Sequence, residues 1–132
     1  GQVAFVSGFN EALAHQIVAG ADTLVMPSRY APCGLAQLYA LHYGTVPVVR
    51  NTGGLGDSVR DATPETLAAG TATGIVFQDA TAAALTDALR RALALFRDKK
   101  AWVRLQRSGM KADFSWKSSA QTYLEIYRNA SS

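Results

Sequence analysis

Four short apolar runs alternate with helical patterns along this chain, and this alternation constrains the fold more than any other feature of the sequence. Each run is bounded by Gly, Pro, Ser or Asp, and the runs cover Val3–Val6, Thr23–Met26, Val46–Val49 and Gly74–Phe77. Strands that alternate with helices pair in parallel, because a parallel pair needs a long crossover connection. The sequence therefore predicts an α/β fold with a parallel sheet of about four strands and flanking helices.

Helical patterns fill the connections between these runs. A first helix is predicted from about Glu11 to Ala19, with Asn10 as its cap and Gly20 at its end. The helix that follows Ala31 is apolar almost all round, so we expect it to be buried against the sheet. The glycine at position 44 closes it.

Three further helices are expected between about residues 81 and 129, and a shorter stretch, Ala62–Thr73, is interpreted as a connection. Aromatic and apolar stripes at helical spacing usually belong to a core. We therefore assign the following residues to packing: Leu85, Leu89, Leu93, Phe96, Trp102, Val103, Leu105, Trp116, Tyr123, Leu124, Ile126 and Tyr127.

Composition excludes several classes of protein. The 132 residues are 48% hydrophobic and 17% charged, which suits one domain with a core. The 13 basic residues are scattered and fit a solvated face, whereas nucleic-acid binding needs a clustered stripe. A lone cysteine and two histidines offer neither a disulfide nor metal-ligand spacing, so we expect no metal and a reducing, cytoplasmic setting. No apolar stretch reaches the roughly 18 residues of a membrane span, so no membrane partner is expected.

Two of the predicted strands run straight into turns that begin helices. Thr23–Met26 leads into Pro27–Leu35, and Val46–Val49 leads into Asn51–Asp57. Both turns are expected at the same edge of the parallel sheet. Helix N-termini there offer free amide N–H groups and positive dipole ends to phosphate and hydroxyl oxygens. The crevice between the two turns is therefore the predicted binding site.

The first turn contains a local inconsistency at Ala31. Pro32 suits the first helical position, which makes Ala31 the cap, and alanine is about 1 kcal/mol worse there than Asp, Asn or Ser. An acid or a small polar residue is the expected occupant. Gly34 lets a ligand approach the backbone closely, and Gly34 and Leu35 offer first-turn amides to its oxygens.

Several long ordered motifs run through the chain: Pro27-Ser28-Arg29-Tyr30-Ala31-Pro32-Cys33-Gly34-Leu35-Ala36-Gln37-Leu38-Tyr39, Tyr43-Gly44-Thr45-Val46-Pro47-Val48-Val49, Thr52-Gly53-Gly54-Leu55-Gly56-Asp57, Ala72-Thr73-Gly74 and Asp113-Phe114-Ser115-Trp116. Together they resemble the bacterial glycogen synthases and the related starch synthases, over essentially the whole chain. The resemblance implies a retaining glycosyltransferase of the GT-B architecture, in which two Rossmann-like domains face each other across a cleft. Glucose would pass from ADP-glucose to the non-reducing end of an α-1,4-glucan, without a cofactor.

The resemblance also implies which part of such an enzyme this is. Residues 1–132 correspond to the later part of the C-terminal, donor-nucleotide-binding domain, including its C-terminal helices. The family's N-terminal domain, and an Arg and Lys pair that neutralises the donor diphosphate, are expected upstream of residue 1. We therefore expect the chain to be a piece of a larger protein.

Individual residues take roles from this resemblance. Phe9 falls where the family places an aromatic ring over the adenine, and Tyr39 falls where related glycosyltransferases hold the ribose. Ala31 falls where the family has a glutamate that contacts the donor sugar. The donor sugar and diphosphate would be held by Cys33, Gly34, Leu35, Thr52, Gly53 and Gly54.

The missing carboxylate at Ala31 has a chemical consequence. Departure of ADP leaves an oxocarbenium-like sugar, and a carboxylate there orients the sugar hydroxyls and complements the positive charge. Loss of one such preorganised group commonly lowers the rate roughly a hundredfold to a thousandfold. The chain is therefore predicted to be inactive as it stands.

Structural interpretations and other functions stay open from sequence alone. Phe9 also fits a core aromatic, Cys33 a small buried hydrophobe, and Thr52-Gly53-Gly54 a tight turn. A non-catalytic module that binds glucan or nucleotide is compatible with Ala31. A Rossmann-type dehydrogenase is a third reading, but the chain lacks both a G-x-G-x-x-G opening and an acidic ribose ligand about 20 residues further on.

Overall fold

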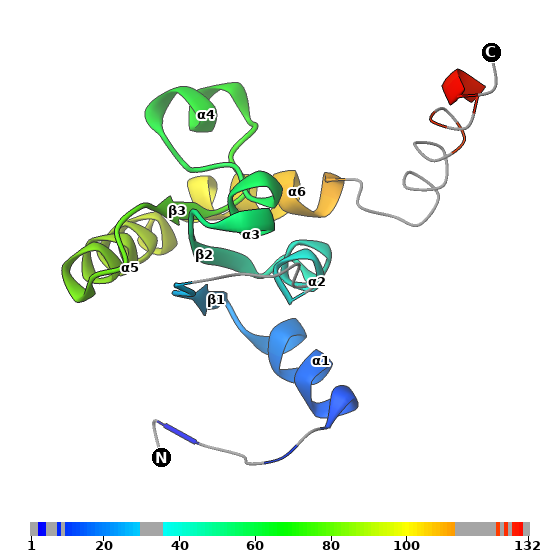
Figure 1. The fold of residues 1–132 in the computed structure, drawn as a ribbon. Coiled ribbons are helices and arrows are strands. Elements are labelled where there is room, and N and C mark those ends of the chain that lie inside the picture. The colour runs from blue at the N-terminus through cyan, green and yellow to red at the C-terminus, as the bar shows by residue number, and fades with distance from the viewer. Residues whose placement is uncertain are drawn as a thin grey trace.

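A computed structural model describes residues 3, 4, 8, 10–29, 36–112, 124, 126 and 128–130. Figure 1 shows the order of its elements along the chain. They are α1 (Glu11–Gly20), β1 (Thr23–Met26), α2 (Ala36–Tyr43), β2 (Val46–Arg50), α3 (Gly53–Ser58), α4 (Pro64–Ala69), β3 (Ile75–Phe77), α5 (Ala82–Arg97) and α6 (Lys99–Lys111).

The three strands form a parallel sheet in the order β1-β2-β3. Side chains alternate between the two faces of a strand, so Val46 and Val48 point to the same side as Ile75 and Phe77. That side packs on Ala88, Ala92, Trp102 and Leu105 of α5 and α6. On the opposite face, Val49 and Val76 pack on Leu55 and Val59 in and after α3. The predicted α/β fold with a parallel sheet and flanking helices is confirmed.

The first predicted strand is not seen. Val3 and Ala4 lie outside any strand, and Val3 is 92% exposed, while Phe5 and Val6 lie outside the described residues. A segment forms a β-strand only when it hydrogen-bonds to a neighbouring strand, and an apolar run in the sequence does not show which strand that is. The described sheet therefore has three strands where the sequence predicted about four.

The first two helices follow the sequence closely. Asn10 caps α1, since its side-chain oxygen accepts a hydrogen bond from the Leu13 amide at 3.0 Å. Gly44 follows α2 with a φ of 79°, a conformation that favours glycine. Only part of α2 is buried, however: Tyr39 and Tyr43 are 38% and 41% exposed, which corrects the expectation of a helix buried almost all round.

The apolar stripe predicted on α5 is only partly buried: Leu85 and Leu89 are half-buried, and Leu85 packs against the core. Leu93 and Phe96 are 56% and 44% exposed, whereas Ala88 and Ala92 are buried. Small side chains let the helix approach the sheet closely, and the larger ones then lie toward its flanks. Trp102 and Leu105 of α6 are buried as predicted.

Other apolar residues assigned to packing are exposed as well. Val103 is 39% exposed, and in the C-terminal segment Leu124 and Ile126 are 53% and 57% exposed. Trp116, Tyr123 and Tyr127 lie outside the described residues.

The stretch interpreted as a connection contains a helix, α4. Thr63 caps it: the Thr63 hydroxyl accepts from the Thr66 amide, and the Thr66 hydroxyl accepts from the Thr63 amide at 2.8 Å. Pro64 stands at the first turn, and Gly70 ends the helix in the left-handed conformation at φ 71°. The signal was present in the order Thr, Pro, Thr, Gly, which is typical of a short capped helix.

None of the described helices combines the length and the apolar character that crossing a bilayer requires.

Candidate functional site

All three strands end at one edge of the sheet, because they are parallel and in register. Met26 pairs with Val49, and Arg50 pairs with Phe77. The chain leaves β1 through Pro27, Ser28 and Arg29, and leaves β2 through Asn51 and Thr52. The parallel pairing thus brings the starts of the two predicted turns to the same carboxyl edge, which is where ligands bind in open α/β sheets.

Arg50, the last residue of the middle strand, connects the ends of all three strands. Its Nε donates to the Gln78 carbonyl at 3.0 Å, just beyond β3. Its Nη1 donates to the carbonyls of Ser28 at 3.3 Å and Arg29 at 2.9 Å, just beyond β1. The side chain is partly buried. Sequence reasoning missed this residue, although a charged side chain that ends an apolar strand run was a visible signal.

Asn51 strengthens the same edge on the β3 side. Its amide donates to the Phe77 carbonyl at 2.7 Å, and its side-chain Nδ2 donates to the Gln78 Oε1 at 3.0 Å. A Cβ on Gly56 would overlap the Asn51 Oδ1, so the Asn51 side chain packs directly against the backbone of α3. The second turn is therefore tied both to the neighbouring strand and to the helix that it begins.

The second turn opens α3. Thr52 has an extended backbone, and its side chain makes no capping hydrogen bond. Gly53 has a φ of 49°, which lies in the left-handed region that favours glycine. Gly54 continues the helix. The backbone conformation alone therefore explains the glycine at position 53, while the Thr52 hydroxyl makes no hydrogen bond within the described residues.

Tyr39 lies on α2 and faces α1. Its ring centroid is 4.5 Å from that of His15, with the two planes tilted by 53°. The His15 Nδ1 lies 3.2 Å from the Tyr43 hydroxyl, so His15 packs between two tyrosines. His15 therefore has a packing role between α1 and α2. Tyr39 keeps an exposed surface near the first turn of α2.

Gln37, the second residue of α2, is only 3% exposed. Its side-chain Oε1 is buried and has no hydrogen-bond partner among the described residues.

The remaining predicted site residues fall outside the described part of the chain. These are Phe9, Ala31, Cys33, Gly34 and Leu35. The structure therefore places Tyr39, Thr52, Gly53 and Gly54, with Tyr39 on one helix and the other three together at the start of another.

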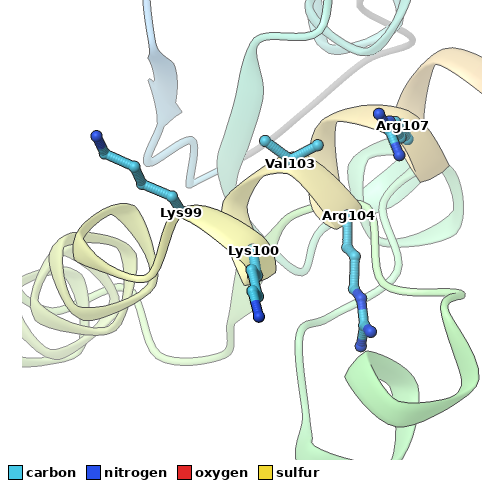
Figure 2. Close-up of a pocket in the computed structure, with 5 residues that line it drawn as sticks. All are labelled: Lys99, Lys100, Val103, Arg104 and Arg107. Carbon is cyan, nitrogen blue, oxygen red and sulfur yellow. The ribbon is translucent and has the colours of Figure 1, made fainter.

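Some grooves of the described part of the chain lie outside the predicted site residues. One, of about 180 Å³, is at the carboxyl edge and is lined by residues after β1 and around the start of α5, among them Pro27, Arg29, Phe77 and Thr81. Another, of about 390 Å³, runs along α6 and is lined by Lys99, Lys100, Val103, Arg104 and Arg107. Figure 2 shows Lys100 and Arg104 extending to one side of α6, away from Lys99 and Arg107, so the four cationic side chains do not converge on one point. This α6 groove therefore has the form of a solvated helix face.

No group of three or more potential metal ligands occurs within the described residues.

Comparison with known proteins gives a consistent set of relatives. The family of glycosyl transferases group 1 matches residues 1–107. A glycogen synthase of Thioalkalivibrio sulfidiphilus is 62% identical over 122 residues, which cover 92% of this chain and 25% of that protein. Glycogen synthase 1 of Methylococcus capsulatus is 55% identical over 129 residues, 98% of this chain and 26% of that protein.

Solved structures of similar fold point the same way. The catalytic domain of starch synthase IV from Arabidopsis thaliana, bound to ADP and acarbose, matches with a TM-score of 0.82 and 41% identity, over 92% of this chain and 25% of that one. Sucrose-phosphate synthase from Thermosynechococcus elongatus matches with a TM-score of 0.70 and 31% identity, over 99% of this chain and 31% of that one. The chain spans about a quarter of the length of the curated relatives that it matches.

Proposed function

Because the chain belongs to the glycosyl transferases group 1, we propose that it forms part of the donor-binding domain of a retaining glycogen synthase with the GT-B architecture. The whole enzyme would transfer glucose from ADP-glucose to the non-reducing end of an α-1,4-glucan. Its relatives at 50–62% identity that carry the name glycogen synthase support this class of reaction. The starch synthase of similar fold, which binds ADP and acarbose, supports an adenine nucleotide as the donor.

One structural observation carries the proposal. The parallel strands bring Pro27–Arg29 and Asn51–Gly54 to the same carboxyl edge, and both segments belong to the motifs that resemble the family. Backbone amides at the start of a helix favour phosphate oxygens. The donor diphosphate and sugar are accordingly assigned to the two turns, through Cys33, Gly34 and Leu35 of the first and Thr52, Gly53 and Gly54 of the second.

The nucleotide end of the donor is assigned to two aromatic side chains. Tyr39 presents a ring that is 38% exposed near the first turn of α2. Phe9 directly precedes Asn10, the cap of α1, and α1 packs against the helix that carries Tyr39. Both residues are therefore proposed to contact the nucleoside.

The proposal needs a glucan acceptor and a second domain. The matched relatives are about four times as long as this chain, so the acceptor site and the missing diphosphate-neutralising cations are assigned to the rest of the protein. No cofactor takes part in the proposed reaction. The single cysteine in 132 residues fits a cytoplasmic location, since that compartment keeps thiols reduced.

The activity test turns on Ala31. A full-length chimera is made from the Thioalkalivibrio sulfidiphilus glycogen synthase by replacing its matching quarter with this chain, and it is called the completed protein. Glucose transfer from ADP-glucose is measured for the completed protein with Ala31 and with Ala31→Glu. We expect Ala31→Glu to raise kcat roughly a hundredfold to a thousandfold, because the carboxylate stabilises charge that develops as ADP leaves.

Ala31→Gln is the matched control, since it has the shape of glutamate without its charge. It is expected to recover less activity than Ala31→Glu. If Ala31→Glu transfers glucose no faster than the Ala31 protein, the assignment of position 31 is wrong.

The alanine at position 31 favours one other function, a binding module without catalysis. Such a module would bind a glucan chain in preference to the nucleotide. Calorimetric titration of the completed Ala31 protein with ADP and with a maltooligosaccharide separates the two proposals. The synthase proposal expects ADP to bind and to be displaced by ADP-glucose, whereas the module expects only the sugar chain to bind.

A further inference from the structure

The strongest unexplained feature of the carboxyl edge is Arg50. Its guanidinium makes three hydrogen bonds, to the carbonyls of Ser28, Arg29 and Gln78. None of these partners is charged, and no carboxylate of the described residues forms an ion pair with it. A partly buried arginine that contacts only backbone carbonyls fixes main-chain geometry and neutralises no charge.

We propose that Arg50 is a positioning residue for glucose transfer, and that it holds Ser28–Arg29, at the end of β1, in place against Asn51–Thr52, at the end of β2. The inference rests on the proposed function, because that function assigns the donor to these turns. Arg50 bonds to Ser28 and Arg29, which are among the described residues at the start of the first turn. Its own backbone continues directly into the second turn at Asn51 and Thr52.

The shape of the side chain matters for this role. Nε reaches the β3 side at Gln78, while Nη1 reaches the β1 side at Arg29, so the planar fork spans the middle strand in both directions. A lysine has the charge, but its three N–H donors share one nitrogen, so it cannot place separate donor atoms toward Gln78 and Arg29 as the guanidinium does. Reacting groups must be held close to their productive geometry, and a misplacement of about 1 Å can lower a rate about a hundredfold.

Arg91 offers a matched control in the same protein. It is also a partly buried arginine, and its Nη2 donates to the Asp61 carboxylate at 2.9 Å and to the Ala62 carbonyl at 2.8 Å. Asp61 pairs with Gly74 immediately before β3 and accepts from the Val76 amide within it, so this second clamp lies beside β3 and contacts neither Ser28–Arg29 nor Asn51–Gly54. Removal of Arg91 should weaken the fold without displacing the donor turns.

The kinetic test uses the completed protein that carries Ala31→Glu. Arg50→Met, Arg50→Lys and Arg91→Met are compared for kcat, for KM of ADP-glucose and of glucan, and for melting temperature. Arg50→Met is expected to lower kcat/KM for ADP-glucose about a hundredfold. Its KM for glucan should stay unchanged, and Arg50→Lys should not restore the loss. Arg91→Met should lower the melting temperature at least as much as Arg50→Met does. It should leave kcat and the KM values for ADP-glucose and glucan unchanged.

Two kinetic outcomes would overturn the inference. One is an Arg50→Met enzyme with the parent's kcat/KM. The other is an Arg50→Lys enzyme as active as the parent. That result would show that the rate depends on the positive charge at position 50 and not on the planar fork of the guanidinium.

Hydrogen exchange supplies a readout that does not depend on catalysis. Peptides that contain Ser28–Arg29 and Asn51–Gly54 are expected to exchange faster in Arg50→Met and at the parental rate in Arg91→Met. Equal exchange of these peptides in both variants would reject the positioning role. If the Ala31→Glu parent itself transferred no glucose, the proposed function would fail, while the exchange measurement would still decide the role of Arg50.

Discussion

At position 74 the structure leaves no room for a side chain. A Cβ on Gly74 would lie 2.5 Å from the Pro47 carbonyl oxygen and 2.7 Å from the Val59 Cγ1. The carbonyl belongs to the buried middle strand, so it cannot move aside easily. Gly74 is thus a steric requirement of the contact between two strands.

We predict that Gly74→Ala lowers the free energy of unfolding by about 1–3 kcal/mol, the usual cost of overpacking a core. Urea denaturation followed by tryptophan fluorescence measures the change. Gly20→Ala is the control, since it ends α1 with no atom within 4 Å of the new Cβ and no positive φ. A Gly74→Ala protein as stable as Gly20→Ala would contradict the packing described above.

Single residues show clearly what sequence can and cannot predict. Asn10 was identified as a helix cap because capping depends on local chemistry that the sequence contains. Arg50 was not identified, because its three partners lie 21 to 28 residues away along the chain. A contact of that kind follows from strand pairing and not from any local pattern.

At the scale of elements, α4 depends on one threonine. The Thr66 hydroxyl accepts from the Thr63 amide and donates to the Asp61 carbonyl at 2.7 Å. It thereby ties the helix to Asp61, which pairs with Gly74 immediately before β3. A helix of six residues has little stability of its own, so such side-chain bonds decide whether it forms.

Thr66→Val, which keeps the shape and removes the hydroxyl, is expected to cost about 1–2 kcal/mol. Thr86→Val on α5 is the matched control, because the exposed Thr86 hydroxyl donates only to the Ala82 carbonyl within its own helix. Denaturant midpoints of the two variants check this. Equal midpoints would show that the Thr66 network contributes nothing.

The elements that were predicted well are those with strong local signals. Three of the four apolar runs became strands, and α1, α5 and α6 begin at or within a residue of the expected positions. The stripe of α5 was predicted correctly at Leu85, which packs against the core, but not at its end, where Leu93 and Phe96 are exposed and Ala88 and Ala92 pack on the sheet instead. Which side of a helix is buried depends on how closely the helix approaches the sheet. The hydropathy pattern of the helix does not show this distance.

At the scale of the whole molecule, the positively charged side chains of the α6 groove lie on the solvent-exposed surface and away from the candidate site. Lys100 and Arg104 are exposed, and their side chains point away from the helix without converging (Figure 2). None of the groove residues belongs to the strand ends or to the two turns of the candidate site.

The double variant Lys100→Glu/Arg104→Glu is therefore expected to change KM for ADP-glucose by less than about twofold, because solvent and salt screen exposed charges. Steady-state kinetics of the completed Ala31→Glu protein at physiological salt provides the measurement. A tenfold loss of donor affinity would mean that the α6 groove takes part in binding after all.

The site was predictable to the extent that topology determines it. Parallel pairing, which the alternation of strands and helices implied, was enough to bring Thr52 and Gly53 to the edge where β1 also ends. The resemblance supplied the roles of individual residues, which neither periodicity nor spacing could have given. Tyr39 shows the limit: its ring contact with His15 joins two helices whose mutual packing no sequence pattern predicted.

The sheet is not equally protected along its width. Ile75, Val76 and Phe77 are all buried in β3 and Val46–Val49 are buried in β2, whereas β1 pairs with one strand among the described residues and leaves Val25 37% exposed. Local opening costs least where burial is least, so unfolding fluctuations should start at α1 and β1 and reach β2 and β3 last. Arg50 is part of the stable middle strand β2, and its hydrogen bonds to Ser28 and Arg29 restrain the end of the less stable strand β1. Substitutions confined to the first strand should therefore change how often Ser28–Arg29 opens while leaving the pairing of β2 with β3 intact.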